Sequence, residues 1–407
     1  MAAMNGTFAS ARAEKRRDIL DRVESLRDVA TAHATEAESL ETLAGPVVEA
    51  MAASRLWALK LPAELGGAEA DPVTQIEAIE AMTAIDTSAG WALMIGATSI
   101  GWPGAYLPDA GAQRMFSDLG RLPTAAGIGG ISGTALPVDG GYRVTGRFSF
   151  GSGIRHAEWV LAGAPITKDG EGPVEARSFV VPIDQVTVHL DSWHVAGLKG
   201  TGSNDFSLDE VFVPAEMSWD RAIMMDGRPE RGGAIFRLGM PSYTANEHTA
   251  FSLGCARRAL ELIGEMSSKQ RRAGSGMMAI ADRPVFQHFY GQATQRYQAM
   301  RAHAFNVFEA LWQTACSGRV PDARAQAEAR VTSALVTDTC VDIVNQAFHF
   351  AGGSVLQQSN LLQRYWRDVN AAAQHMAVSN AAYEAYGQLL LGIEPAPQTG
   401  AGGIARA

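Results

Sequence analysis

The spacing of apolar residues changes twice along this chain of 407 residues, and that change restricts the folds it can adopt. From about residue 11 to residue 118, apolar side chains recur every three or four positions, which is typical of amphipathic helices. Between about residues 123 and 231 the pattern becomes short runs rich in β-branched and aromatic residues, separated by Gly, Pro and Asp. The helical spacing returns over about residues 235–391. Because strands do not alternate with helices, the pattern disfavours a doubly wound parallel sheet.

This order predicts an α+β protein that is mostly helical. We expect an N-terminal helical domain over residues 1–122, a central β-barrel domain over residues 123–232 and a C-terminal four-helix bundle over residues 233–394, with four long helices. Residues 395–407 are rich in Pro, Gly and Ala, and we expect a disordered tail there. The length fits this division at roughly 150 residues per domain.

Local signals predict where some elements begin. Pro72 after Asp71 predicts a helix start, because proline suits the first helical position. Residues 139–141, Asp-Gly-Gly, predict a hairpin turn before Tyr142. Residues 87–108 carry no charge, but Gly, Pro, Ser and Thr interrupt them. We therefore expect a buried helix and its loop there rather than a membrane span.

Charge and cysteine content disfavour several classes of function. With 34 basic and 43 acidic residues the formal net charge is −9, and no long basic run is present, so we expect no nucleic-acid partner and no membrane partner. Cys255, Cys316 and Cys340 are widely spaced, which predicts buried apolar cysteines in a reducing compartment and no metal site. The N-terminus lacks the apolar segment of a secretory signal, which predicts a cytoplasmic protein.

Three motifs combine glycines with polar and aromatic residues that can contact a flat ring. Small neighbours allow the backbone to approach such a ring closely. The motifs are Gly146-Arg-Phe-Ser-Phe-Gly-Ser152-Gly-Ile-Arg-His156-Ala-Glu-Trp159; Trp193-His-Val-Ala-Gly-Leu-Lys-Gly200-Thr-Gly-Ser203; and Gly352-Gly353 with Gln363-Arg364-Tyr-Trp-Arg367-Asp368 and His375.

These motifs, in a chain ordered as helices, strands and helices, resemble the acyl-CoA dehydrogenase superfamily over nearly the whole length. In the dehydrogenases, a Glu eight residues after the Arg-Asp pair removes the α-proton of a thioester. Met376 takes that place here, and a thioether cannot accept a proton. The run from Arg367-Asp368 to His375 instead resembles the flavin-dependent monooxygenases built on this fold, the oxygenase components of two-component systems.

The resemblance implies a monooxygenase that depends on reduced flavin. Such an enzyme takes reduced FMN or FAD from a separate NAD(P)H-dependent flavin reductase and forms a C4a-hydroperoxyflavin with molecular oxygen. It then hydroxylates an aromatic or other electron-rich small molecule. The resemblance further implies a homotetramer. The chain shows no sequence for binding a nicotinamide cofactor itself, which agrees with a separate reductase.

Two catalytic residues follow from the resemblance. His375 is expected near flavin and substrate, where a group that titrates near neutral pH can deprotonate a phenol or handle the proton of a peroxide. Ser152 is expected to form a hydrogen bond with flavin N5. The structural alternatives are a helix histidine bonded to a neighbouring carbonyl and a turn serine bonded to the local backbone.

Several further residues are candidates for holding the flavin. Phe150 belongs to the motif that the superfamily places against the ring, and Trp193 is a candidate wall for it. Thr201 and Ser203 lie in a glycine-rich turn that can bond flavin or phosphate, with plain turn chemistry as the alternative.

A second group of residues is expected at the flavin of a neighbouring subunit. Family members often place an Arg at the position of Arg283 on the flavin phosphates, and a solvated surface Arg is the alternative. Gly352 and Gly353 resemble the loop that closes over the neighbour's flavin. His349 replaces the Gln that dehydrogenases carry before this loop, so FMN and FAD both stay open.

The substrate site is expected near the uncharged run. Related oxygenases often carry another active-site His there, whereas residues 98–102, Thr-Ser-Ile-Gly-Trp, contain none. Ser99, Trp102 and Tyr106 are candidates for lining the pocket instead.

Two other functions stay open. The first is a dehydrogenase or oxidase acting on an acyl thioester or a nitroalkane, with a base from another helix: Glu247, Glu261 or Glu265. The second is a catalytically inactive scaffold of this fold that serves as a partner subunit.

Overall fold

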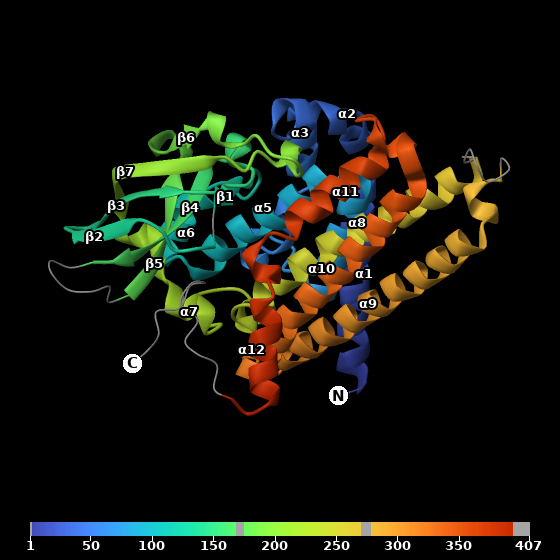
Figure 1. Cartoon of the computed structure of the whole chain (residues 1–407). Helices are drawn as coiled ribbons and strands as arrows, with labels where there is room; N and C mark the ends of the chain where they lie inside the picture. Colours follow the sequence, from blue (N-terminus) through green and yellow to red (C-terminus); the bar gives the residue numbers. More distant parts are fainter. Residues whose placement is uncertain (1, 128, 168–174, 270–277, 394–407) are drawn as a thin grey trace.

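The computed structural model of the chain describes residues 2–127, 129–167, 175–269 and 278–393. The protein is mostly helical and contains one sheet, as the sequence predicts. Figure 1 shows the sheet at one side of the molecule and the long helices at the other. The tail expected at residues 395–407 lies outside the described residues.

Helices make up the N-terminal region. They are α1 (Ala2–Ser25), α2 (Arg27–Leu40), α3 (Gly45–Ala53), α4 (Pro72–Ile85), α5 (Thr87–Tyr106) and α6 (Asp109–Met115). Two 3-10 helices, Leu56–Leu59 and Ala63–Leu65, connect α3 to α4. The segment between α3 and α4 therefore contains short helical turns.

The start of α4 and the burial of α5 agree with the sequence. Asp71 accepts hydrogen bonds from the backbone N–H groups of Val73 and Thr74, both at 3.1 Å, and Pro72 is the first helical residue. Such a cap contributes about 1 kcal/mol to the free energy of unfolding. α5 is buried along almost its whole length, so the uncharged run is a core helix. Among the helices of the described ranges, none is both long enough and apolar enough to cross a membrane.

The middle of the described chain contains one eight-stranded sheet. Its strands are β1 (Ala125–Gly127), β2 (Thr134–Val138), β3 (Gly141–Phe148), β4 (Trp159–Ile166), β5 (Glu175–Pro182), β6 (Thr187–His189), β7 (Asp205–Pro214) and β8 (Ser218–Asp220). The order is β6-β7-β3-β2-β4-β5-β8, with β1 beside β4. β1 and β2 run parallel to β4, and the other neighbours are antiparallel. β2 and β3 form the hairpin predicted at residues 139–141.

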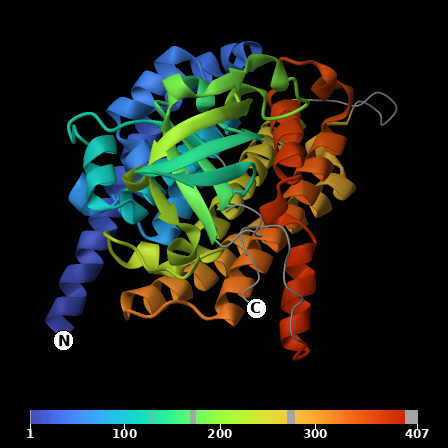
Figure 2. The same cartoon turned by 90° about the vertical axis from the view of Figure 1, so that its left-hand side faces the viewer.

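The structure does not confirm the closed barrel. The order of strands begins at β6 and ends at β8, and within the described residues no pairing joins these two strands. A closed barrel needs a neighbour on both sides of every strand. Figure 2 shows the sheet facing the viewer, with the N-terminal helices on one side and the C-terminal helices on the other.

The C-terminal region differs from the expected four long helices. The described part contains the short α7 (Arg221–Met225), then α8 (Ser242–Lys269), α9 (Pro284–Cys316), α10 (Ala323–Ala351), α11 (Leu361–Ala372) and α12 (Ala381–Leu390). Three helices are long, and a turn over residues 373–380 divides the last segment into two shorter ones. α8 packs against both α4 and α10, and the first part of α8 is almost entirely buried.

The cysteines agree only in part with the prediction. Cys255 and Cys340 are buried, but Cys316 is exposed. The prediction is wrong for Cys316 because α9 ends at this residue and the chain turns there through exposed positions.

Candidate active site

Trp91, near the start of α5, is the point where the predicted catalytic residues meet. Its indole Nε1 donates a hydrogen bond to Ser152 Oγ, 3.0 Å away. The edge of its ring faces the ring of His375, with 6.3 Å between the ring centroids. Trp91 is buried, and its ring also packs edge-on against Phe251 of α8. One indole therefore brings Ser152 and His375 into the same cluster.

Ser152 lies after β3, in a loop joined to the second motif. The backbone N–H of Gly151 donates to Asn204 O, and that of Gly153 donates to Thr201 O, each at 3.0 Å. Ser152 Oγ lies 2.7 Å from Ser203 Oγ. These bonds place the first two motifs side by side, although about fifty residues separate them in sequence.

The loop of the second motif is fixed to α11, which carries the third motif. Asp368 Oδ1 accepts a hydrogen bond from the backbone N–H of Leu198 at 2.6 Å, and its Oδ2 accepts one from Thr87 Oγ1 at 2.5 Å. Arg367 donates to Ala196 O at 2.8 Å. Gly197 lies against α11 so closely that a Cβ there would be 2.3 Å from Arg367 O. The Arg-Asp pair thus has a structural task, which is to hold the loop beside the active-site cluster.

His375 follows α11 and starts the 3-10 turn Met376–Val378. Its Nδ1 accepts a hydrogen bond from the backbone N–H of Ala377 at 3.2 Å. The neutral ring therefore carries its hydrogen on Nε2 and acts there as a donor. The ring lies beside that of His248, with centroids 4.2 Å apart and an angle of 32° between the planes.

Both imidazoles are neutral at pH 7. Burial lowers the pKa of His375 to about 4. Part of the residue nevertheless keeps an exposed surface. His248 is buried on α8, and burial lowers its pKa well below the ordinary value, with the nearby His375 as a second cause. Figure 1 shows α5, α8 and α11, from which this cluster is built, lying next to one another.

Phe150 has the features of a residue that contacts a bound molecule. Its side chain is 67% exposed, and its φ of 67° is in the left-handed region, which costs an L-residue free energy. The edge of its ring faces buried Trp193 at 6.4 Å between centroids. Trp193 donates from Nε1 to Lys199 O at 3.1 Å, so its position is fixed by the loop.

The candidate base Glu247 takes part in a buried ion pair with Lys60. Lys60 Nζ lies 2.5 Å from Glu247 Oε1 and also donates to Tyr243 O at 2.9 Å. Thr98 donates to the same carboxylate oxygen. Burial raises the pKa of Glu247 and lowers that of Lys60, and their mutual contact offsets part of both shifts.

The other two candidate bases are paired on the outer face of α8. Glu261 bonds with Arg257 and Arg258, and Glu265 forms an ion pair with Arg258. Met376, at the position of the dehydrogenase base, is 48% exposed and has no group that can accept a proton. This arrangement disfavours abstraction of an α-proton.

The predicted substrate residues have different surroundings. Tyr106 is buried, its hydroxyl donates to Phe236 O at 2.9 Å, and it packs on Trp219. These contacts pack Tyr106 into the core, and its assignment to the substrate pocket stays a prediction. Ser99 and Trp102 are also buried, but within the described residues the indole Nε1 of Trp102 has no hydrogen-bond partner.

Arg283 and the pair Gly352-Gly353 lie in a cluster of their own. Arg283 directly precedes α9, whose Phe286 and Phe289 pack against Phe350 at 5.4 and 4.7 Å between centroids. Gly352, two residues after Phe350, caps the C-terminus of α10 with a φ of 66°. In the described parts of the chain, no hydrogen bond or ring contact joins this cluster to Ser152 or His375.

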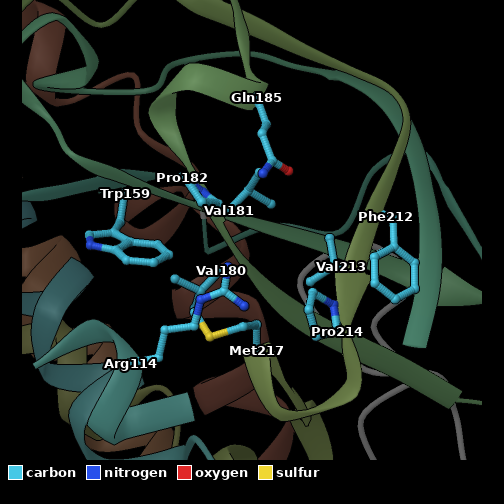
Figure 3. A pocket seen from close by; sticks show the side chains of 10 residues that line it. All are labelled: Arg114, Trp159, Val180, Val181, Pro182, Gln185, Phe212, Val213, Pro214 and Met217. Atoms are coloured by element: carbon cyan, nitrogen blue, oxygen red, sulfur yellow. The ribbon is translucent and has the colours of Figure 1, made fainter. Parts of the chain in front are cut away.

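A hollow of about 240 Å³ lies on the sheet, apart from the cluster around Trp91. Figure 3 shows its lining, which comes mainly from β5 and β7 and includes Arg114 and Trp159. None of the predicted site residues lines it. Trp159 of β4 therefore faces this hollow.

Sequence reasoning missed His248 and Trp91. The neighbouring Glu247 was predicted as a candidate base, but no role was predicted for His248. The absence of a His at residues 98–102 was a signal, because the second imidazole comes from α8 instead. Trp91 belongs to the uncharged run, where nothing in the local pattern distinguishes it from a core residue.

Comparison with known proteins agrees with the fold and the motifs. Residues 13–108 match the family model "Acyl-CoA dehydrogenase, N-terminal domain", and residues 247–380 match "Acyl-CoA dehydrogenase, C-terminal domain". A pigment production hydroxylase of Rhodococcus erythropolis is 27% identical over 390 residues, which is 93% of this chain and 97% of that protein. The oxygenase subunit HsaA of a flavin-dependent monooxygenase from Mycobacterium tuberculosis is 25% identical over 382 residues, 93% of this chain and 96% of that one.

A solved structure shows the same fold. XiaF from Streptomyces sp., in complex with FADH2 and glycerol, superposes with a TM-score of 0.89 at 26% identity, covering 96% of this chain and 99% of that one. The match extends over both helical regions and the sheet. The chain therefore belongs to the acyl-CoA dehydrogenase family, in its branch of flavin-dependent monooxygenases that are oxygenase components.

Proposed function

We propose that the protein uses reduced flavin and molecular oxygen to hydroxylate an aromatic or other electron-rich small molecule. The observation that carries this proposal is the cluster in which Trp91 joins Ser152 to His375, with His248 against the His375 ring. By the family resemblance, Met376 stands in the sequence where a dehydrogenase carries its base. The names of the similar hydroxylase and monooxygenase subunit support a flavin-dependent hydroxylation.

The residues present fit a reduced flavin. The exposed ring of Phe150, with Trp193 behind it, offers an apolar surface for a flat ring, and the adjacent Ser152 offers a hydroxyl. When bound, reduced flavin supplies the two electrons with which molecular oxygen is activated. We assign Phe150, Ser152 and Trp193 to the ring, and Thr201 and Ser203 to the support of Ser152.

His375 acts in this proposal as a hydrogen-bond donor. Its Nδ1 is occupied by Ala377 N–H, so the neutral ring presents Nε2–H to the oxygen atoms of the reaction. Deprotonation of a phenol by His375 would need Nδ1 to lose that bond. Of the two tasks open to this histidine, the geometry therefore favours handling the peroxide proton over removing a substrate proton.

Substrate contacts are proposed for Ser99 and Trp102. The unpartnered indole N–H of Trp102 is a donor for an oxygen atom of the substrate, since a buried donor without a partner costs free energy. Trp102 stacks on Tyr243, whose buried hydroxyl also has no partner in the part of the chain that the structure describes. These two donors suit a phenolic or carbonyl oxygen.

The assembly is proposed from the family. We infer a cytoplasmic homotetramer with domains at residues 1–122, 123–232 and 233–394, which receives reduced FMN or FAD from a separate NAD(P)H-dependent reductase. Arg283, Gly352 and Gly353 then contact the flavin of a neighbouring subunit. Their separation from Ser152 within one chain supports this assignment, because a residue far from the site in its own subunit can reach the site of another.

The test is to mix the protein with anaerobically reduced FMN or FAD, add oxygenated buffer and follow flavin absorbance by stopped flow. Reoxidation slower than that of free flavin, followed by product from a panel of phenols and indoles, is the expected result. Reoxidation at the free-flavin rate without any product would contradict the proposal. Anaerobic bleaching of bound oxidised flavin by an acyl thioester or nitroalkane would instead support the dehydrogenase.

A further inference from the structure

A continuous chain of hydrogen bonds runs through Ser152. Trp91 Nε1 donates to Ser152 Oγ at 3.0 Å, and Ser152 Oγ lies 2.7 Å from Ser203 Oγ. Ser203 Oγ lies 2.7 Å from Thr201 Oγ1, which donates to Leu198 O at 2.8 Å. The three hydroxyl side chains are all buried.

The Leu198 carbonyl, at the end of this series of hydrogen bonds, fixes the direction in which each bond is donated. A carbonyl oxygen only accepts, so the single hydroxyl hydrogen of Thr201 points to Leu198 O. Thr201 must then accept from Ser203, and Ser203, its hydrogen now used, must accept from Ser152. An indole N–H only donates, so Trp91 occupies one lone pair of the Ser152 oxygen. Ser152 has no free hydrogen left, but one lone pair remains.

We propose that Ser203 and Thr201 are positioning residues that hold Ser152 as a hydrogen-bond acceptor toward flavin N5, so that the site distinguishes the two redox states of the cofactor. N5 of reduced flavin carries a hydrogen and can donate it to Ser152. N5 of oxidised flavin carries only a lone pair, which would face the lone pair of Ser152 without a hydrogen between them. This inference rests on the proposed function, which places Ser152 beside N5.

Asp368 holds Leu198, at the end of the series of hydrogen bonds, in place. Leu198 has a φ of 58°, a left-handed conformation that an L-residue adopts only when its surroundings hold it there. Asp368 accepts the backbone N–H of Leu198, and Thr87 holds the other oxygen of the carboxylate. Asp368 is therefore a third positioning residue, which acts on Ser152 through the Leu198 carbonyl.

The test is the ratio of two dissociation constants, for oxidised and for reduced flavin, measured with both FMN and FAD. Ser203→Ala leaves the Ser152 hydrogen free to bond oxidised N5. Thr201→Val removes the group that orients Ser203, and the direction of the chain is then no longer fixed. We expect each variant to shift the ratio toward oxidised flavin by about tenfold, the effect of one hydrogen bond. Thr201→Ser keeps the hydroxyl and is expected to keep the wild-type ratio.

Three control variants distinguish a change in the direction of the hydrogen bonds from a general disturbance of the structure. Ser267→Ala and Thr339→Val each remove a buried hydroxyl that donates to a backbone carbonyl elsewhere, and both are expected to keep the ratio. Trp91→Phe removes a bond to the same Ser152 oxygen but does not free its hydrogen. That variant is expected to alter the affinity for both flavins and to leave their ratio unchanged.

An unchanged ratio in folded Ser203→Ala and Thr201→Val would overturn the inference, as would an equal shift in Trp91→Phe. The midpoint potential of the bound flavin gives the same answer independently, because it depends on the same ratio of affinities. Failure of the proposed function looks different: the wild-type protein would then bind neither form of flavin, or bind reduced flavin without hydroxylating any substrate.

Discussion

The imidazole rings of His248 and His375 lie beside each other, with 4.2 Å between their centroids, although one belongs to the core helix α8 and the other to the turn after α11. The buried His248 limits the movement of the partly exposed His375. Trp91 contacts both rings and closes the cluster on the side of Ser152.

Replacing His375 with Ala should reduce hydroxylation by about 100-fold while the protein stays folded, because the Nε2–H donor is lost. Reduced flavin should still be oxidised, with hydrogen peroxide released in place of product. The measurement is the coupling ratio, product formed per reduced flavin oxidised. His288→Ala, which removes an exposed histidine of α9, is the control. Unchanged coupling in the His375 variant would remove this residue from the mechanism.

We expect His248 to act by packing its aromatic ring against His375, and not through hydrogen bonds of its ring nitrogens. His248→Ala should lower the coupling ratio by about tenfold, since a displaced donor is a poor one. His248→Phe keeps an aromatic ring against His375 and should retain most of the coupling. If the Phe variant is as impaired as the Ala variant, the ring nitrogens of His248 take part directly.

The ion pair of Lys60 and Glu247 should contribute to stability as a unit. Lys60→Met leaves the Glu247 carboxylate buried with only Thr98 as a donor, and it should lower the free energy of unfolding by about 3 to 5 kcal/mol. Adding Glu247→Gln should restore a large part of that loss. Urea unfolding measures both. Equal instability of the single and the double variant would show that lost packing of the Lys60 stem dominates.

His156 should make the protein less stable in mild acid. Its ring stacks on Trp57 with 5.7 Å between centroids, and burial lowers its pKa to about 4. In the unfolded chain the pKa is near 6.5, so between these values the unfolded state binds more protons and stability falls as the pH falls. From pH 7.5 to pH 5 the loss is about 2 kcal/mol. His156→Phe keeps the stacking and should remove that part of the pH dependence, as measured by urea unfolding at both pH values.

Tyr106→Phe tests whether Tyr106 serves the core or the substrate. The variant loses one hydrogen bond to Phe236 O and should be less stable by about 1 kcal/mol, with normal coupling and an unchanged KM for the substrate. A large increase in KM at nearly unchanged stability would assign Tyr106 to the substrate pocket.

The sequence predicts the order of elements well because periodicity and capping are local. The helix start at Pro72, the hairpin at residues 139–141 and the buried helix α5 all depend on neighbouring residues. The course of the sheet was not predictable in the same way. Its edges at β6 and β8 depend on which strands pair across the chain, and no local pattern carries that information.

The same distinction between local patterns and contacts across the chain applies to the residues of the candidate active site. Ser152 and His375 could be predicted as site residues because they belong to motifs that resemble a family. Trp91 and His248 were missed because their importance comes from contacts between α5, α8 and α11, which are far apart in sequence. The exposure of Cys316 was missed for a related reason, since a helical pattern does not tell where a helix extends beyond the elements packed against it.

The carboxylate of Asp368 has a consequence for how molecules reach this site. It joins α11 to Leu198 at a separation of 170 residues, and to Thr87 at a separation of 281. A hinge motion that parted the sheet region from the helices would strip this buried carboxylate of the Leu198 donor. We therefore expect the two walls of the site to move as one body, with flavin and substrate entering through an opening between side chains rather than by the separation of whole regions.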